Sequence, residues 1–305
     1  MNVLVLGGNG FIGSHLVDAL LLAGHQVRVL DRRSELHRPP LPQVEYRLGN
    51  WADTPFLCDA LEGIEFVYHL VSTTLPSTSN LDPIADIEGN LVNTLKLLQL
   101  MVQKGVVRIL FLSSGGTVYG IPSRSPIPET HALQPICSYG VVKVAIEQYL
   151  FMFQALHGLK PIIIRASNPY GERQGHDGVQ GVINTVLKKI ILGENIDIWG
   201  DGSVVRDFIH ISDLVDLCIK ASVRDCVGVL NAGSGIGCSI DQVLRVVMDA
   251  TQRRITAVFL QGRAYDVPSV VLDISKAADT LGWHPRVSLS DGVAQTWRWM
   301  QASTR

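Results

Sequence analysis

The chain has 305 residues, of which 47% are hydrophobic and 18% charged, and its formal net charge is −2. That length and composition suit a globular protein with a substantial core, exclude intrinsic disorder and leave no basic excess to bind nucleic acid. Five scattered cysteines without a C-x-x-C pair, nine histidines without metal-ligand spacing and no apolar run of about 20 residues predict a cytoplasmic protein with reduced thiols, no metal site and no membrane span.

Short runs rich in β-branched residues alternate with helix-length segments through the first half of the chain. In chain order, the sequence predicts a strand at Val3–Leu6, a helix at Phe11–Ala23, strands at Gln26–Asp31, Val44–Leu48 and Glu65–Leu70, a helix at Pro83–Lys104, a strand at Val107–Ser113, a helix at Ser138–His157 and a strand at Lys160–Arg165. Apolar strands separated by helices indicate a parallel sheet covered on both faces. We therefore expect an α/β fold with a Rossmann-like, doubly wound parallel sheet.

The pattern changes after about Asn168, where longer glycine-rich loops separate helical patterns at Val182–Leu192 and Ile240–Thr251. We expect a smaller, mixed α/β C-terminal lobe here. Residues 1–168 are assigned to a dinucleotide-binding domain. Residues 169–305 are assigned mainly to a substrate-binding lobe, with some of these segments returning to the first domain.

The first motif is a glycine-rich turn between a predicted strand and a predicted helix, with Gly7, Gly10 and Gly13 in G-x-x-G-x-x-G spacing. Glycines let the backbone approach a pyrophosphate, and the helix N-terminus offers free N–H groups. Asp31 ends the second predicted strand, where an acid binds the adenosine ribose and repels a 2′-phosphate. The motif predicts NAD binding, while Arg32 and Arg33 keep NADP open as an alternative.

The second motif is SYGVVK, which places Tyr139 and Lys143 one helical turn apart on the same face. A free tyrosine has a pKa near 10 and is a poor base at pH 7. Two nearby cations, Lys143 and a nicotinamide ring, would favour the tyrosinate, and lowering the pKa by about three units takes roughly 4 kcal/mol. Tyr139 could then remove a hydroxyl proton while the adjacent carbon gives up hydride.

The whole set of motifs resembles the extended short-chain dehydrogenase/reductase family, and within it the nucleotide-sugar epimerases and dehydratases. The resemblance rests on the motifs GGNGFIG, the acid of VLD, DPIADIEGN, SSGGTVYG, SYGVVK, RASNPYG, VRDFIH, RAYDVP, LDISKA and LGWHP. The resemblance implies further cofactor-binding residues: Phe11 and Ile12 at the pyrophosphate turn, Asn50 and Trp51 at the adenine, Leu70 and Asn90 flanking the cofactor, and Ser167 near the nicotinamide. Asn50 departs from the family, which usually has an aspartate there.

The same resemblance implies a nucleotide-sugar substrate, UDP-linked by likeness to the UDP-glucose 4-epimerases. Asn168 falls near the sugar diphosphate, Arg206 and Arg263 form a diphosphate clamp, and Asp266 binds the nucleoside ribose. Guanidinium groups suit this role because their paired donors match phosphate oxygens. The resemblance also implies a homodimer formed by the helices near Asp86–Lys104 and Ser138–His157.

One position departs from the family in SSGGTVYG. The family's catalytic Ser or Thr lies four residues before the tyrosine of V-Y-G, and here that position holds Gly115. In an extended strand, Gly115 and Thr117 would share a face and Ser114 would point away. We therefore expect Thr117 to supply the hydroxyl that contacts the substrate O4, with Ser114 as a second candidate and water at Gly115 as the alternative.

The same stretch separates the chemistries within the family. The 4,6-dehydratases carry an acidic pair at the positions of Gly116 and Thr117, whereas this chain has no acid there to protonate a leaving hydroxyl. The sequence therefore favours NAD-dependent 4-epimerisation of UDP-Glc/UDP-Gal through a transient 4-keto sugar. In the epimerases that the chain resembles, a bulky residue four positions after the ribose-binding aspartate excludes N-acetylated sugars. Four positions after Asp266 stands the small Val270, so the resemblance implies that UDP-GlcNAc/UDP-GalNAc are accepted as well. A 4-keto nucleotide-sugar reductase and a non-catalytic dinucleotide-binding regulator stay open as alternatives.

Overall fold

The computed structural model describes residues 1–175, 181–224, 226–262 and 267–303. The chain forms two compact units, each gathered from separate parts of the sequence. Unit 1 comprises Met1–Val118, Pro135–Arg165 and Val215–Leu230, and unit 2 comprises Tyr119–Gln134, Ala166–Leu214 and Asn231–Arg305. The assignment of residues 1–168 to the dinucleotide and 169–305 mainly to the substrate stays a prediction.

A seven-stranded sheet forms the centre of unit 1, in the order β10-β6-β5-β4-β1-β2-β3. Every pairing from β5 across to β3 is parallel, which confirms the predicted doubly wound fold. The strands are β1 (Asn2–Leu6), β2 (Gln26–Asp31), β3 (Val44–Leu48), β4 (Phe66–His69), β5 (Arg108–Ser114), β6 (Lys160–Ala166) and β10 (Gly228–Ala232). The strand order reverses between β1 and β4, and ligands of such sheets bind at the carboxyl ends of the strands beside that point.

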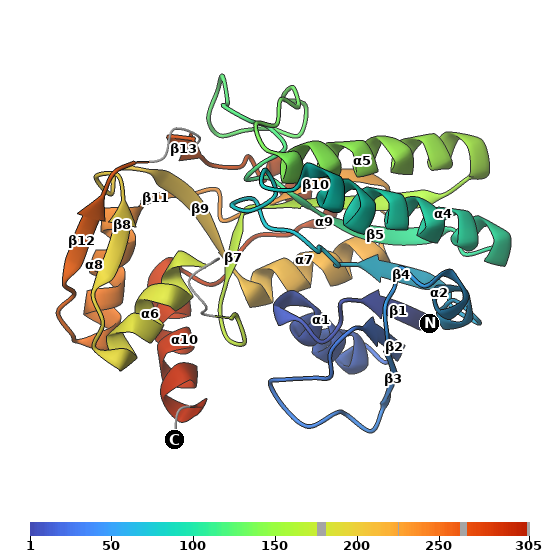
Figure 1. Ribbon diagram of the computed structural model, residues 1–305, viewed down its shortest axis with the longest axis horizontal. Coiled ribbons are helices and arrows are strands. Elements are labelled where there is room, and N and C mark those ends of the chain that lie inside the picture. The colour runs from blue at the N-terminus through green and yellow to red at the C-terminus, as the bar shows by residue number, and fades with distance from the viewer. Residues whose placement is uncertain (176–180, 225, 263–266, 304–305) are drawn as a thin grey trace. The chain divides into compact units, whose positions relative to one another are not determined.

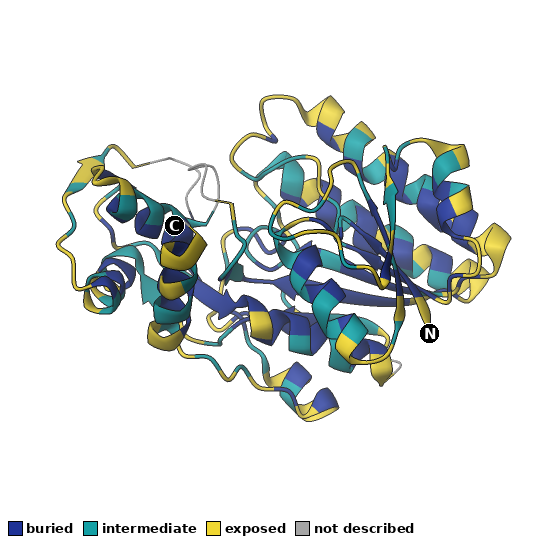
Figure 2. Cartoon of the chain, turned by 90° about the horizontal axis from the view of Figure 1, so that it is seen from below, coloured by how far each residue is buried: buried dark blue, intermediate teal, exposed yellow. Residues whose placement is uncertain are grey.

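Helices cover both faces of this sheet, with α4 and α5 on one side and α1 and α7 on the other (Figure 1). Figure 2 shows that the sheet strands are mostly buried while the helices carry the exposed outer faces. The helices are α1 (Phe11–Leu22), α2 (Thr54–Ala60), α3 (Pro83–Asp86), η1 (Ile87–Val92), α4 (Asn93–Lys104), α5 (Ser138–His157) and α7 (Ile211–Val223).

The predicted single α-helix over Pro83–Lys104 is wrong in its middle, because η1 is a π-helical turn between α3 and α4. Gly89 lies in this turn, and a Cβ there would come within 2.5 Å of the Thr73 Oγ1. The Thr73 N–H also donates to the Asn90 Oδ1 at 2.8 Å. The wider turn thus coincides with a close approach of the loop after β4, and such π-turns are frequent at functional sites.

Unit 2 is built on β9, which pairs antiparallel with β11 and parallel with β13 and β7. The predicted helices at Val182–Leu192 and Ile240–Thr251 are confirmed as α6 and α8. The remaining elements of the unit are β7 (Asn168–Tyr170), β8 (Ile196–Trp199), β9 (Val205–His210), β11 (Gly237–Ser239), β12 (Ala257–Leu260), β13 (Ser269–Val270), α9 (Ser275–Leu281) and α10 (Leu289–Ser303).

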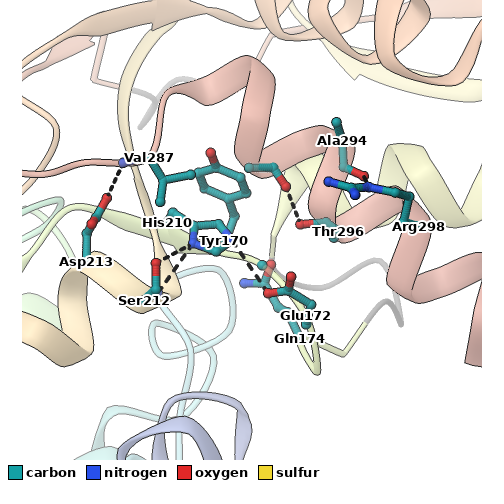
Figure 3. A network of polar contacts seen from close by, with 12 residues as sticks. Tyr170, Glu172, Gln174, His210, Ser212, Asp213, Val287, Ala294, Thr296 and Arg298 are labelled. Carbon is teal, nitrogen blue, oxygen red and sulfur yellow. Dashed lines mark hydrogen bonds and ion pairs between the residues drawn. The ribbon is translucent and has the colours of Figure 1, made fainter. Parts of the chain in front are cut away.

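A buried polar network lies at the end of β9 in unit 2 (Figure 3). The His210 Nδ1 lies 2.8 Å from the Ser212 Oγ, and its Nε2 lies 3.5 Å from the Glu172 Oε2. The Tyr170 ring meets the imidazole edge to face, with the centroids 5.4 Å apart. These contacts fix the chain where β7 and β9 end.

None of the helices in the described part of the chain is both long and apolar enough to cross a membrane.

Candidate active site

The glycine turn follows β1 directly and leads into α1. Gly7 has φ +82°, which favours glycine, and a Cβ on Gly13 would collide with the Gly7 carbonyl. Gly10 caps α1 without a side chain, so the first N–H groups of the helix, from Phe11 and Ile12 onward, have no side-chain acceptor at the cap. The turn therefore offers backbone donors and a close approach, as a pyrophosphate requires.

Asp31 lies at the carboxyl end of β2, beside this turn. Its Oδ2 accepts the Asn9 N–H at 3.1 Å and its Oδ1 accepts the Arg33 N–H at 3.2 Å. The Asn9 side chain donates to the Arg33 carbonyl at 2.6 Å, which ties the glycine turn to the chain after β2. Arg32 and Arg33 are exposed. The glycine turn and this carboxylate fit the pyrophosphate and adenosine ribose of NAD.

Leu70 and Asn90 lie near the end of β4. A Cβ on Gly7 would meet the Leu70 carbonyl carbon at 3.6 Å, so the residue that follows β4 packs against the glycine turn. Asn90 is buried, and its amide donates to the Asp86 Oδ1 at 2.9 Å and accepts the Thr73 N–H at 2.8 Å. Its side chain is therefore used to hold the loop after β4, and its contact with the cofactor stays a prediction.

Asn50 and Trp51 differ in their placement. Asn50 is exposed and its Oδ1 accepts the Ala52 N–H at 3.0 Å. The Trp51 indole is only 7% exposed and packs on the His69 ring, with the centroids 5.1 Å apart. The Trp51 side chain is thus part of the core of unit 1, while a contact of either residue with adenine stays a prediction.

The chain turns sharply where β5 ends at Ser114. The Thr117 and Val118 N–H groups both donate to the Ser114 carbonyl, at 3.3 and 3.1 Å. The extended geometry that favoured Thr117 is therefore wrong, because the backbone folds back after Ser114. A Cβ on Gly140 would lie 2.9 Å from the Thr117 carbonyl, so the turn still packs against the first turn of α5.

A different observation supports the predicted role of the Thr117 hydroxyl in substrate binding. Its Oγ1 is buried and has no hydrogen-bond partner within the described residues. A buried hydroxyl without a partner is costly, and it is satisfied when a ligand supplies the missing group. A role of Thr117 in contacting the substrate stays a prediction.

Tyr139 and Lys143 both lie in the first two turns of α5. The Lys143 Nζ lies 5.4 Å from the centre of the Tyr139 ring and donates to the Leu112 carbonyl of β5 at 2.9 Å. Burial lowers the pKa of Lys143 to about 8, although the charges of Glu147 and Asp86 oppose this shift. At pH 7 Lys143 is therefore still a cation.

Tyr139 is far from ionisation in the protein alone. Burial raises the pKa of Tyr139 to about 12, while the polar side chain of Ser72 lowers it and the charge of Asp86 raises it further. Bringing this pKa to near 7 takes about 7 kcal/mol of differential interaction, more than the 4 kcal/mol expected for a solvated phenol. The favourable interactions of the tyrosinate with nearby cations must therefore also offset the free-energy cost of ionising a buried phenol.

A buried ion pair supports Lys143 from one turn further along α5. Glu147 is fully buried and binds the Arg165 guanidinium of β6 at 2.6 Å, and it also accepts the Ser113 hydroxyl. Tyr139, Lys143 and Glu147 occupy one helix face at spacings of four residues. The Glu147 charge raises the pKa of Lys143, so this carboxylate favours the charged form of the lysine.

The predicted residues of unit 2 gather around the buried Asp207. The Ser167 hydroxyl lies 3.5 Å from the Asp207 Oδ1, and the Asn168 amide donates to the Asp207 carbonyl at 3.0 Å. The neighbouring Arg206 donates to the Val267 carbonyl at 2.6 Å, and its backbone pairs with the buried Val270 of β13. Arg263 and Asp266 lie outside the described residues.

The sequence analysis missed three buried polar residues near Tyr139 and Lys143. Glu147 could have been found from its i+4 spacing to Lys143, and Arg165 ends a predicted strand. Asp86 gave no signal, because its partners lie up to 52 residues away in the sequence. Over the described part of the chain, no three His, Cys, Asp or Glu side chains gather in a way that could hold a metal ion.

The sequence matches the model of the NAD dependent epimerase/dehydratase family over residues 3–233. It is 34% identical to a UDP-glucose 4-epimerase of Mycolicibacterium smegmatis over 97% of both chains. It is also 34% identical to a dTDP-4-dehydro-6-deoxyglucose reductase of Escherichia coli over 95% of both chains.

Solved structures of epimerases are similar to this chain over its full length. The UDP-glucose 4-epimerase of Thermotoga maritima, determined with UDP-glucose, has a TM-score of 0.95 at 33% identity, covering 100% of both chains. The UDP-glucose 4-epimerase of Thermus thermophilus, determined with NAD, has a TM-score of 0.94 at 30% identity, covering 99% of this chain and 100% of the other. The glycine turn, Asp31 and the Tyr139–Lys143 pair thus stand in a chain that belongs to the NAD-dependent epimerase/dehydratase family.

Proposed function

We propose that the protein catalyses the NAD-dependent 4-epimerisation of a UDP-sugar, UDP-glucose to UDP-galactose and back, through a transient 4-keto sugar. The likeness to UDP-glucose 4-epimerases over the full length of the chain supports this reaction. The observation that carries it is the Tyr139–Lys143 pair at the start of α5, with the Lys143 Nζ 5.4 Å from the tyrosine ring.

The roles of the side chains follow from their charges. Tyr139 takes the proton of the sugar 4-hydroxyl and later returns it, which requires the phenol to ionise near neutral pH. Lys143, kept cationic by Glu147 and Asp86, stabilises the tyrosinate. NAD, when bound, would supply the acceptor and the donor for the hydride at C4. Thr117 is proposed to hold the sugar O4 through its buried hydroxyl.

The remaining roles concern binding. Gly7, Gly10 and Gly13, with the N–H groups at the start of α1, would hold the pyrophosphate of NAD, and Asp31 its adenosine ribose. Asn50, Trp51, Leu70, Asn90 and Ser167 are proposed as further cofactor contacts. Asn168, Arg206, Arg263 and Asp266 are proposed to bind the nucleotide sugar, in which guanidinium groups match the diphosphate.

The test is proton NMR of the purified protein, without added cofactor, incubated separately with UDP-Glc, UDP-Gal, UDP-GlcNAc and UDP-GalNAc. We expect the C4 epimer to appear from the substrates that are accepted, because the cofactor is regenerated in each turnover. Conversion of UDP-GlcNAc and UDP-GalNAc would support the expectation that the small Val270 admits N-acetylated sugars. Tyr139→Phe should be inactive, and Tyr149→Phe on the same helix should keep the activity. Equal activity of Tyr139→Phe and the wild type would overturn the proposal.

A second candidate function is the reduction of a 4-keto nucleotide sugar, favoured by the likeness to the dTDP-4-dehydro-6-deoxyglucose reductase. It would use the same tyrosine as a proton donor but would consume the reduced cofactor. Stoichiometric loss of NADH or NADPH absorbance with a 4-keto nucleotide sugar, and no epimer in the NMR experiment, would favour the reductase.

We also propose a homodimer and a cytoplasmic location. Exposed apolar side chains lie on η1, α4 and α5, among them Val92, Val102, Val141 and Met152. A second copy of the chain could cover this stripe, and light scattering of Val141→Glu, with loss of the dimer as the expected result, would test it. All five cysteines are free thiols, which suits a reducing compartment.

A further inference from the structure

Asp86 is a buried carboxylate at the end of α3 whose side chain reaches three different segments of unit 1. It is 0% exposed. Its Oδ1 accepts the Thr74 hydroxyl at 2.7 Å and the Asn90 amide at 2.9 Å. Its Oδ2 accepts the Ser138 hydroxyl at 2.7 Å. The carboxylate thus joins the loop after β4, the π-turn η1 and the first residue of α5.

The same loop also caps α5. Cys137, at the N-cap, makes no side-chain cap bond. The Asn80 Oδ1 accepts the Ser138 N–H at 2.8 Å and the Ser79 Oγ accepts the Tyr139 N–H at 3.1 Å instead. The start of the helix that carries Tyr139 is therefore fixed by a segment about 60 residues away, and Asp86 locks that segment in place.

All three donors to Asp86 are neutral, so the carboxylate is buried without an ion-pair partner among them. Burying such a charge is unfavourable, and an amide or apolar group would remove this cost. The charge has a use at the neighbouring site, because it raises the pKa of Lys143 against the effect of burial. Among the described residues, the other titratable groups that interact electrostatically with the pair include Glu147 on α5, His69 on β4 and Cys137 before α5.

We propose that Asp86 is a positioning residue for the Tyr139–Lys143 pair: it locks the loop of residues 72–80 onto the first turn of α5 and holds a buried carboxylate at the start of the helix that carries both residues. The Ser72 hydroxyl, in the locked loop, donates to the Thr74 carbonyl at 3.1 Å, and Ser72 lowers the pKa of Tyr139. This inference rests on the proposed function only where a reaction rate is measured.

The experiment compares Asp86→Asn and Ser138→Ala with the wild type and with Glu88→Gln as the matched control. Glu88 is an exposed carboxylate two residues further along the chain. The first readout is the ionisation of Lys143, followed as the Cε chemical shift of 13C-labelled lysine against pH and assigned with Lys143→Met. The second readout is kcat and KM for the 4-epimerisation, and thermal unfolding checks that each variant is folded.

We expect the Lys143 midpoint to move to lower pH in Asp86→Asn only, because this variant alone loses the nearby negative charge. We expect kcat to fall about ten- to a hundredfold in Asp86→Asn and less in Ser138→Ala, with KM nearly unchanged, since misplacement of a reacting group lowers the rate. Glu88→Gln should match the wild type in every readout.

An unchanged Lys143 midpoint or an unchanged kcat in folded Asp86→Asn would overturn the proposal. If Asp86→Asn does not fold, an unchanged kcat in Ser138→Ala overturns the positioning role. A wild-type protein that epimerises no UDP-sugar overturns the proposed function instead, and the lysine titration then still decides whether Asp86 acts on Lys143.

Discussion

The buried His69 makes the free energy of unfolding of unit 1 depend on pH. Its ring is buried between Trp51 and Phe111, and its Nε2 lies 2.9 Å from the Thr94 Oγ1. Burial, and then the charge of Lys143, lowers the pKa of His69 to about 3. In the unfolded chain the same group titrates near 6.5. The imidazole is therefore neutral in the folded protein at any pH above about 3.

The sign of the effect follows from proton binding. Between pH 6.5 and 3 the unfolded chain binds a proton that the folded protein does not, so the free energy of unfolding falls as the pH is lowered through this window. For one such histidine, the loss between pH 7 and pH 5 is about 2 kcal/mol. His69→Gln removes the titrating group and keeps a side chain that can hydrogen-bond Thr94.

The assay is urea unfolding of the wild type and His69→Gln at pH 7 and pH 5. The loss of Trp51 packing lowers the stability of the variant equally at both values, so only the difference between the two pH values counts. We expect this difference to be about 2 kcal/mol smaller in His69→Gln. An equal pH dependence of both proteins would refute the burial of a neutral imidazole.

Three further results are expected. Arg165→Met should lower the free energy of unfolding by about 3–5 kcal/mol, because it leaves Glu147 buried and unpaired, and Arg165→Met/Glu147→Met should restore most of it in the same urea assay. The epimerase rate should fall above about pH 8 as Lys143 loses its proton, and Lys143→Arg, which stays charged, should lack this alkaline limb in a kcat pH profile. Thr117→Val should lower kcat about ten- to a hundredfold, as loss of one hydrogen bond to a charged group does, whereas Ser114→Ala should change kcat little.

The sheet of unit 1 was predictable because its signals are local. Ser138–His157 is a helix with the bounds that its apolar spacing predicts, and Gly158 with φ +69° ends it. The glycine turn and Asp31 lie where the spacing puts them, because each follows directly from the end of a strand. Hydrophobic periodicity and turn residues suffice for such elements.

Other parts depend on contacts that a single sequence does not reveal. The π-turn of η1 forms where Gly89 meets Thr73, and the turn after Ser114 packs on Gly140, so neither follows from local propensity. The two-residue strand β13 of unit 2 pairs with β9, about 60 residues away in the sequence. Asp86 looked like any residue of a predicted helix until its three partners were placed around it.

The most direct test of the central claim is the fate of the hydrogen on C4. UDP-glucose carrying deuterium at C4 is incubated with the protein in ordinary water, and the product is analysed by proton NMR and mass spectrometry. Reversible oxidation at C4, with Tyr139 moving only the hydroxyl proton, predicts UDP-galactose that keeps its deuterium at C4. Loss of the deuterium to water, or a change at any other carbon, would contradict the account.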